Sequence, residues 1–284
     1  MSSNKPMSPE MAAPSSRPGS WHLNELDFSA IDREFVRGQD KLFLLVCASS
    51  FIESGSDIYS RNLANYFADD DEVSTWLRDH WEPEELRHGR ALKAYVGHVW
   101  PEFDWEPAYQ EFIAEYAKLF TSAHPEPTRG QELAGRCFVE VGTTTYYQAL
   151  AAICNEPVLR GLAWRIRADE VRHYKHFYAY FLRYRERERL SRAQIAAALI
   201  RRILDMRRND AGVALRHVAA RVFGLRASPS GEKQLITEAM DAVRVNFPAE
   251  LAVRMALKPL HIAQRMQRSI EGPLATLTRR MILR

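Results

Sequence analysis

Apolar and polar positions follow a helical period along almost the whole chain. From 31 to 67, apolar residues recur at spacings of three and four, and the polar run 69–71 ends this pattern. The period resumes near Trp76 and continues to about His98, with Pro83 expected to mark a kink or a new start. No segment shows the sustained two-residue alternation of a half-buried strand.

The remaining two-thirds of the chain shows the same period, interrupted by Pro, Asn and Gly. Connectors are expected around Pro101 and at 124–127, 155–157 and 227–231. Between them we expect helices over 107–120, 129–154, 158–188, 191–221, 232–246 and 248–280. The chain is therefore predicted to be all-α.

The composition is that of a globular protein, with 46% hydrophobic and 26% charged residues. The longest uninterrupted apolar run, 42–48, is far shorter than the roughly 20 residues of a membrane-spanning helix. Residues 1–20 are rich in Ser, Pro and Met, so we expect a disordered tail and no secretory signal. Three widely spaced cysteines suggest neither a disulfide framework nor a zinc site. These features predict a cytoplasmic protein without a membrane span.

The net charge of +3 is distributed unevenly along the chain. Residues 183–284 contain 21 basic and 9 acidic residues, so the preceding part is acidic. A basic segment can attract an acidic partner or a nucleic acid, and it can equally be a solvated helix face. The segment carries no recognisable nucleic-acid-binding motif, and we expect no nucleic-acid partner.

A Glu-x-x-His pair occurs twice, as Glu85-Leu86-Arg87-His88 and as Glu170-Val171-Arg172-His173. Residues three apart share one face of a helix, so each pair can bind one metal ion. An acidic residue precedes each Glu, namely Glu84 and Asp169. A single pair is weak support for a metal site, but the repetition of the longer pattern is much stronger.

Two further glutamates complete the pattern. Glu53 follows an apolar stretch, and Glu140 lies within Cys137-Phe138-Val139-Glu140-Val141. A carboxylate on an apolar helix face must be paired, protonated or bound to a cation. The midpoints between Glu53 and Glu85 and between Glu140 and Glu170 fall at 69 and 155, where turns are expected. In two antiparallel helix pairs these side chains would lie level, about 22 Å from each turn at 1.5 Å per residue.

Four carboxylates and two imidazoles at mid-height of a four-helix bundle match the ligand set of ferritin-like metal-carboxylate proteins. Oxygen and imidazole ligands suit iron or manganese. We therefore predict a site for two iron ions, or two manganese ions, with the ligands Glu53, Glu85, His88, Glu140, Glu170 and His173. The simpler explanation, surface Glu with incidental His, leaves the repetition and the matched midpoints without a cause.

Neighbouring residues are candidates for a supporting layer. A metal-bound imidazole usually donates its other N–H to a carboxylate, and Glu84 and Asp169 are the candidates for this. Arg87 and Arg172 could pair with those carboxylates. Thr143 lies one turn after a predicted ligand, where its hydroxyl could hydrogen-bond a bound oxygen species or could bond back to its own helix.

Tyrosines and one further histidine crowd the same helices. Five tyrosines are candidates for a redox role, although packed rings are commoner: Tyr146, Tyr147, Tyr174, Tyr178 and Tyr180. His176 follows His173 by three residues, and we place it near the site or on the surface because the ligand set is already complete.

Two segments around these residues carry a resemblance to a known family. The segment 81–89, Trp-Glu-Pro-Glu-Glu-Leu-Arg-His-Gly, is similar to the Trp-x-x-Glu-Glu-x-Arg-His-Gly segment of soluble acyl-carrier-protein desaturases. The segment 168–173 is similar to their Ala-Asp-Glu-x-Arg-His, and Glu140 with Thr143 is similar to their Glu-x-x-Thr. The similarity covers 31–182, about half the chain.

The resemblance implies a ferritin-like bundle over 21–190, and we expect the basic helices of 191–284 to pack on it. It also implies a di-iron enzyme that activates O2 with electrons from an external donor such as a ferredoxin, and acts on an acyl chain presented by an acyl carrier protein. Other di-iron families share the ligand order, so a hydroxylase or N-oxygenase of a biosynthetic pathway and a non-catalytic iron-binding protein remain alternatives. Arylamine N-oxygenases carry an extra His one turn before the last ligand Glu, where this chain has Ile166. A homodimer is a further option.

The arginine pairs Arg201/Arg202 and Arg207/Arg208 recur along one expected helix with apolar residues between them. Their planar donors match carboxylate and phosphate groups, so this helix could offer them to an acidic carrier protein. In the alternative, these arginines pair with the acidic front part of the chain and bind nothing else.

Overall fold

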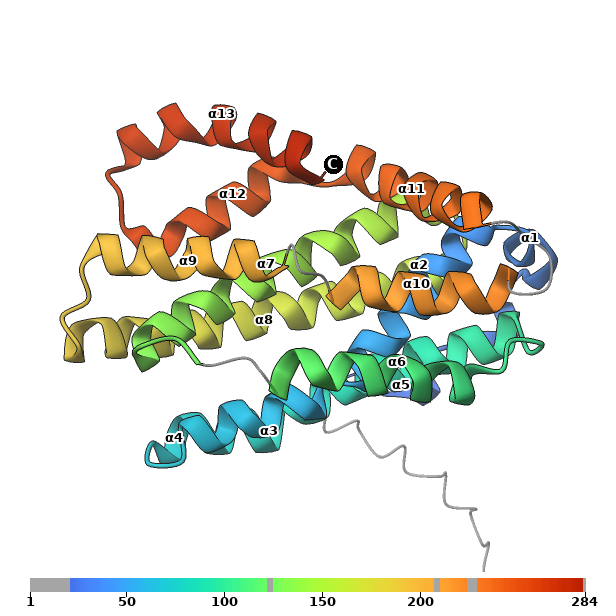
Figure 1. Ribbon diagram of the computed structural model, residues 1–284, viewed down its shortest axis with the longest axis horizontal. Coiled ribbons are helices and arrows are strands. Elements are labelled where there is room, and N and C mark those ends of the chain that lie inside the picture. The colour runs from blue at the N-terminus through green and yellow to red at the C-terminus, as the bar shows by residue number, and fades with distance from the viewer. Residues whose placement is uncertain (1–20, 122–124, 207–209, 224–228, 283–284) are drawn as a thin grey trace, which may run out of the picture.

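The computed structural model describes residues 21–121, 125–206, 210–223 and 229–282 (Figure 1). Every regular element in these residues is helical and they contain no strand, as the hydrophobic period predicts. The helices before the long central pair are α1 (Arg33–Arg37), α2 (Asp40–Ser54), α3 (Asp57–Tyr66), α4 (Asp71–Trp76), α5 (Glu82–Val99) and α6 (Trp105–Thr121). The remaining ones are α7 (Arg129–Ile153), α8 (Pro157–Arg187), α9 (Arg192–Met206), α10 (Asp210–Phe223), α11 (Pro229–Asn246), α12 (Ala249–Leu257) and α13 (Gln264–Ile282). Short helical turns add η1 (Leu23–Glu25), η2 (Phe28–Ala30), η3 (Leu77–Trp81) and η4 (Lys258–Leu260).

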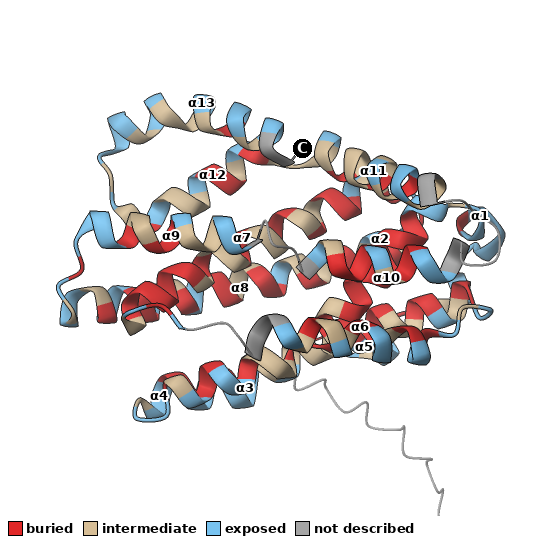
Figure 2. Cartoon of the chain, viewed as in Figure 1, coloured by how far each residue is buried: buried red, intermediate tan, exposed pale blue. Residues whose placement is uncertain are grey.

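Two helix pairs form the centre of the fold. α7 and α8 pack along much of their length, joined by residues 154–156, and α2 packs against α5. α5 also contacts α8, which brings the two pairs together. Figure 2 shows buried residues along these helices, and exposed residues on the outer faces of the helices around them.

A glycine sets the spacing between α2 and α5. A Cβ added at Gly89 would lie 2.6 Å from the backbone nitrogen of Ser54, which no side chain tolerates. Because Ser54 follows Glu53 and Gly89 follows His88, this close approach holds the two predicted ligands side by side.

The prediction of a single helix over 31–67 is wrong, because this segment forms three helices, α1, α2 and α3. α2 ends at Ser54, and Gly55 is its C-terminal cap. A Cβ at Gly55 would lie 2.8 Å from Cδ1 of Ile113, so α6 packs directly on the break. The apolar period continues across it, and the pattern alone therefore does not reveal it.

The change in helix expected near Pro83 is present. Pro83 lies in the first turn of α5, where its missing N–H costs nothing. The turn before it, η3, is π-helical, with a wider hydrogen-bond spacing than the α-helix. The ligand-bearing part of α5 therefore begins immediately after an irregular turn.

The C-terminal helices are shorter than expected. The helix predicted over 191–221 corresponds to two helices, α9 and α10. Residues 207–209 and 224–228 lie outside the described residues. The helix predicted over 248–280 is also two, because Pro259 and the left-handed backbone of His261 (φ 46°) separate α12 from α13. α9, α11 and α12 pack on α7, and α10 packs on α2 and α6, as expected for an extension that covers the centre. The predicted tail, 1–20, also lies outside the described residues.

By length and mean hydropathy alone, the described stretch 40–66 would suffice to cross a membrane. Of its most apolar window, 72% is buried inside the fold, and the core helix of a soluble protein passes the same test. The residues of the run 42–48 are all buried.

Candidate metal centre

Six side chains from four helices converge at the centre of the fold. Glu53 comes from α2, Glu85 and His88 from α5, Glu140 from α7, and Glu170 and His173 from α8. Their exposed fractions lie between 0% and 5%. These are the six residues that the sequence pattern singled out, and the structure brings all of them together.

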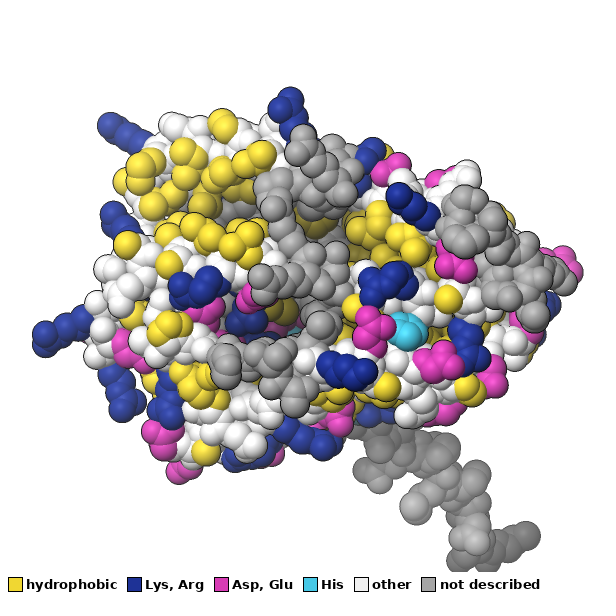
Figure 3. All heavy atoms as spheres, viewed as in Figure 1, with side chains coloured by type: hydrophobic (Ala, Val, Ile, Leu, Met, Phe, Trp, Pro, Cys, Tyr) yellow, Lys and Arg dark blue, Asp and Glu magenta, His cyan; other side chains and the backbone are white. Residues whose placement is uncertain are grey.

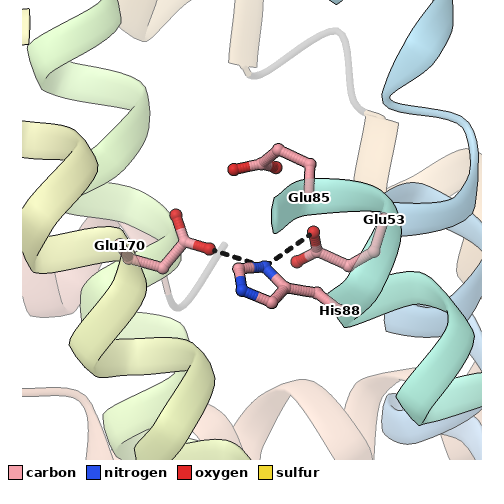
Figure 4. A group of neighbouring side chains, drawn as sticks. All are labelled: Glu53, Glu85, His88 and Glu170. Atoms are coloured by element: carbon pink, nitrogen blue, oxygen red, sulfur yellow. Dashed lines mark ion pairs between the residues drawn. The ribbon is translucent and has the colours of Figure 1, made fainter. Parts of the chain in front are cut away.

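The six residues form two overlapping groups that could each hold a metal ion. One group consists of Glu53, Glu85, His88 and Glu170, and the other of Glu85, Glu140, Glu170 and His173; in each, one ligand atom per residue lies within 4.8 Å of the others. Glu85 and Glu170 belong to both groups. Figure 4 shows the first group, with the carboxylates of Glu53 and Glu170 on either side of the His88 ring. Either group could therefore use these two carboxylates to hold a metal ion.

The two imidazoles are held with one nitrogen facing inward. His88 Nε2 lies 2.9 Å from Oδ2 of Asp169, and His173 Nε2 lies 2.9 Å from Oε2 of Glu84. Each Nδ1 therefore points toward the ligand carboxylates, at 3.2 Å from Glu170 for His88 and 3.0 Å from Glu85 for His173. An outer carboxylate that fixes the ring in this way is typical of metal-bound histidine.

Inward-facing atoms of these residues are buried and have no hydrogen-bond partner among the described residues. They are Glu85 Oε1, His88 Nδ1, Glu140 Oε2, Glu170 Oε1 and His173 Nδ1. Buried polar atoms without a partner are rare and costly. Their concentration at one point fits a site built for cations, and the oxygen and nitrogen donors suit iron or manganese.

An outer layer of arginines balances the outer carboxylates. Arg87 lies 2.8 Å from Asp169, and Arg172 lies 2.6 Å from Asp169 and 3.0 Å from Glu84. Two arginines thus match two acids in this layer. The inner layer has no such match, since its four carboxylates face only two imidazoles. Two divalent ions would neutralise four ionised carboxylates.

The inner carboxylates respond to this crowding when no ion is present. Burial and the neighbouring charge of Glu170 raise the pKa of Glu85 to about 7, and the same two causes raise the pKa of Glu140 well above its usual range. Burial alone would lower the pKa of His88, but its hydrogen bond to Asp169 and the nearby carboxylates of Glu170 and Glu53 raise it well above its ordinary value. These shifts favour the uptake of a proton at side chains that a cation could otherwise contact.

No known family model matches the chain, and no curated protein matches it.

Thr143 touches the ligand layer directly. Its hydroxyl donates to Oε2 of Glu170 at 2.8 Å and also lies 3.3 Å from the backbone oxygen of Glu140. The two orientations considered from the sequence, toward the site and back to its own helix, are therefore both present in one side chain.

Two tyrosines contact the ligand carboxylates. Tyr147 donates to Glu53, and Tyr59 donates to Oε2 of Glu85 at 3.4 Å. Tyr147 is one of the five tyrosines noted in the sequence, but Tyr59 was not among them. Its helix, α3, begins after the break that the pattern did not reveal, so its direction could not be inferred.

Trp21 is the main residue that sequence reasoning missed. Its indole N–H donates to Oδ2 of Asp169 at 2.9 Å, and its ring stacks on His88 at 6.1 Å between centroids. The guanidinium of Arg87 lies 4.9 Å from the same ring. No spacing links residue 21 to the helices, and the polar residues before it suggested only a tail.

His176 lies outside both ligand groups. It stacks on Trp76 at 4.9 Å between ring centroids, and Trp76 in turn makes an edge contact with His173. The structure thus places His176 behind the ligand His173, in agreement with the complete six-residue set.

Proposed function

We propose that this chain is an O2-activating, non-haem di-iron oxidoreductase with a ferritin-like bundle formed by α2, α5, α7 and α8. The observation that carries the proposal is the pair of ligand groups that share Glu85 and Glu170, with a histidine Nδ1 facing into each group. Manganese is the second metal that this donor set would accept.

The protein's own residues would each have a defined task. Glu85 and Glu170 would bridge the ions, while Glu53 with His88 and Glu140 with His173 would complete one ion each. Bound iron ions supply the redox chemistry and the Lewis acidity that O2 activation requires. The hydroxyl of Thr143 donates its proton to Oε2 of Glu170, one of the two carboxylates that the ligand groups share.

The surroundings favour an apolar substrate. The site is enclosed by buried side chains, which keep water away from reactive species. Ile166, one turn before Glu170 on α8, is fully buried and apolar. With the resemblance to soluble acyl-carrier-protein desaturases, this supports oxidation of an aliphatic acyl chain by electrons from an external donor such as a ferredoxin.

Two ion pairs within the chain argue against α9 as the docking surface for a carrier protein. Arg201 and Arg202 form ion pairs with Glu126 and Glu132 of the front part of the chain. Arg207 and Arg208 lie outside the described residues. We therefore assign α9 no docking role in the proposal.

The test begins with the purified full chain, loaded with ferrous iron without oxygen. We expect two irons per chain, O2 consumption once a chemical reductant is supplied, and a dehydrogenated or hydroxylated product from an acyl substrate detected by mass spectrometry. Efficient oxidation of an arylamine, with no product from any acyl substrate, would favour an N-oxygenase instead. A large cage that takes up many irons per chain would favour storage.

A further inference from the structure

A second buried group of charges lies between α7 and α9, outside the metal centre. Glu132 receives hydrogen bonds from Arg136 at 3.1 Å and from Arg202 at 3.2 Å, and its other oxygen accepts from the backbone nitrogen of Glu126. Arg201 pairs with Glu126. We call these five residues the arginine pocket.

The arginine pocket contains more positive than negative charge. Arg136 and Arg202 both pair with Glu132, whose side chain is 4% exposed, while Arg201, itself 43% exposed, pairs with Glu126. Asp205 of α9 also attracts Arg202, but it is exposed, so water screens its charge. Burial and the repulsion of Arg136 lower the pKa of Arg202. Two largely buried guanidiniums therefore share the single carboxylate of Glu132.

Arg202 also has an unused donor. Its Nε is buried and has no hydrogen-bond partner among the described residues. The guanidinium lies directly against α7, because a Cβ added at Gly135 would be 3.1 Å from both Nε and a terminal nitrogen. A glycine in the middle of a helix lowers helix stability. Here it provides the space in which the guanidinium rests.

The arginine pocket is adjacent to the metal centre. Arg136 lies one helical turn before the ligand Glu140 on α7, which is about 6 Å along the helix axis. Tyr59 connects the two, since Arg136 lies 5.6 Å from its ring centroid and its hydroxyl donates to Glu85. Figure 3 shows the surface hollowed beside α9, with basic and acidic side chains on the floor of the hollow.

We infer that Arg136 and Arg202 bind the carboxylate of a free aliphatic acid whose chain extends toward the metal centre. Guanidinium groups present paired donors that match a carboxylate. Two guanidiniums that share the one carboxylate of Glu132 can accept one further negative charge, which suits a monoanion better than a doubly charged phosphate ester. The inference deepens the proposed function by naming a free acid as substrate, and its binding step can be tested without turnover.

The test measures binding of decanoate, decyl phosphate and 1-decanol to the full chain by calorimetry. Each titration is run on the protein as purified and after removal of metal with EDTA, so that binding through iron is recognised. We expect decanoate to bind at least tenfold more tightly than decanol in both samples. Equal affinities for decanoate and decanol would overturn the inference. Tighter binding of decyl phosphate would overturn the choice of a carboxylate.

Variants then locate the binding site. Arg202→Gln should weaken decanoate binding at least tenfold and leave decanol binding unchanged. Arg192→Gln is the matched control on the same helix, because Arg192 is exposed, lies outside the arginine pocket and donates to the backbone oxygen of His261. An equal loss in both variants, or in neither, would contradict the assignment.

Arg202→Gln could disturb folding, so a second variant leaves every charge in place. Gly135→Ala puts a methyl group at 3.1 Å from the guanidinium and should shift it, reducing decanoate affinity several-fold. Unchanged decanoate affinity in both variants, Gly135→Ala and Arg202→Gln, would refute the site. Iron stoichiometry is measured on the same samples. Two irons with no decanoate binding would leave the di-iron proposal intact and reject only the free acid.

Discussion

The candidate metal centre and the arginine pocket are groups of largely buried ionisable residues that both include side chains of α7, but their charges are arranged in opposite ways. At the metal centre, carboxylates outnumber the imidazoles, and the inward atoms lack partners among the described residues. In the arginine pocket, guanidiniums outnumber the carboxylates, and Glu132 accepts several hydrogen bonds. The comparison teaches that burial alone does not define a site; the sign of the unmatched charge indicates which ion can complete it.

The two groups also differ in what they contribute to the fold. Crowded carboxylates repel one another, so the metal centre stabilises the protein chiefly when cations are bound. The arginine pocket joins α7 to α9 and to Glu126 through pairs that form without any ligand. Variants in the first group should therefore change metal content, and variants in the second should change stability.

The largest expected effect concerns the shared carboxylates. Glu170→Ala should lose both irons, because Glu170 belongs to both ligand groups. Glu53→Ala should lose only the iron held with His88. Iron analysis after anaerobic loading measures both, and His176→Ala is the control on α8, expected to retain two irons. Two irons in Glu170→Ala would reject the assignment of the bridging ligands.

Removing the central acid of the arginine pocket should lower stability strongly. Glu132→Gln leaves Arg136 and Arg202 facing one another, and breaking a buried ion pair from one side costs about 3–5 kcal/mol. Urea unfolding measures the change in the free energy of unfolding. The control is Glu102→Gln, which removes an exposed pair with Arg37 and should cost no more than about 1 kcal/mol. Equal effects would show that the pocket is not a buried ion-pair network.

Acid should weaken the same contact. Burial raises the pKa of Glu132, but the attraction of Arg136 and Arg202 outweighs it and holds the pKa below its ordinary value. A lowered folded-state pKa means that the stabilisation is present above the unfolded value, about 4.3 for Glu. It is lost as the pH falls below that value through the lower folded-state pKa. Unfolding free energies measured between pH 5 and pH 3 should therefore fall more steeply for the natural chain than for Glu132→Gln.

The smallest expected effect lies in the outer layer of the metal centre. Trp21→Phe removes the hydrogen bond to Asp169, and one such bond contributes about 1 kcal/mol. Asp169 keeps its contacts with His88, Arg87 and Arg172, so both irons should remain bound. Thermal unfolding measures the change in stability, and iron analysis of the same preparation measures the metal content. Loss of an iron would show that Trp21 positions His88 as well as stabilising the fold.

The convergence of the six candidate ligands was predictable because the information for it is local and periodic. Glu-x-x-His places two donors on one helix face, and the midpoints between paired carboxylates fall at or beside turns marked by Asp70 and Pro157. The helix break at Gly55 was not predictable, because the apolar period crosses it. At the break between α12 and α13 the period also continues, and Pro259 was the one local signal that marked it.

Contacts between distant segments were also beyond the pattern. Nothing in the spacing connects Trp21 with Asp169, or Tyr59 with Glu85. Two features of the arginine pocket could be read in part from the sequence, the adjacent arginines and the acidic front part. That Arg202 rests on Gly135 depends on how α9 crosses α7, which requires the packed structure.

The π-helical turn η3 has a consequence for the tolerance of this chain to insertions and deletions. Such a turn accommodates one residue more than an α-helical turn, and each residue rotates a helix by about 100°. Deleting one residue within Leu77–Trp81 and closing the gap as regular helix would therefore restore an ordinary turn and leave α5 facing α8 as before. Deleting one residue between Glu85 and His88, in regular helix, would instead place these two side chains about 200° apart around the axis. The π-helical turn is thus the part of this region in which a one-residue deletion should preserve the orientation of the ligand pair.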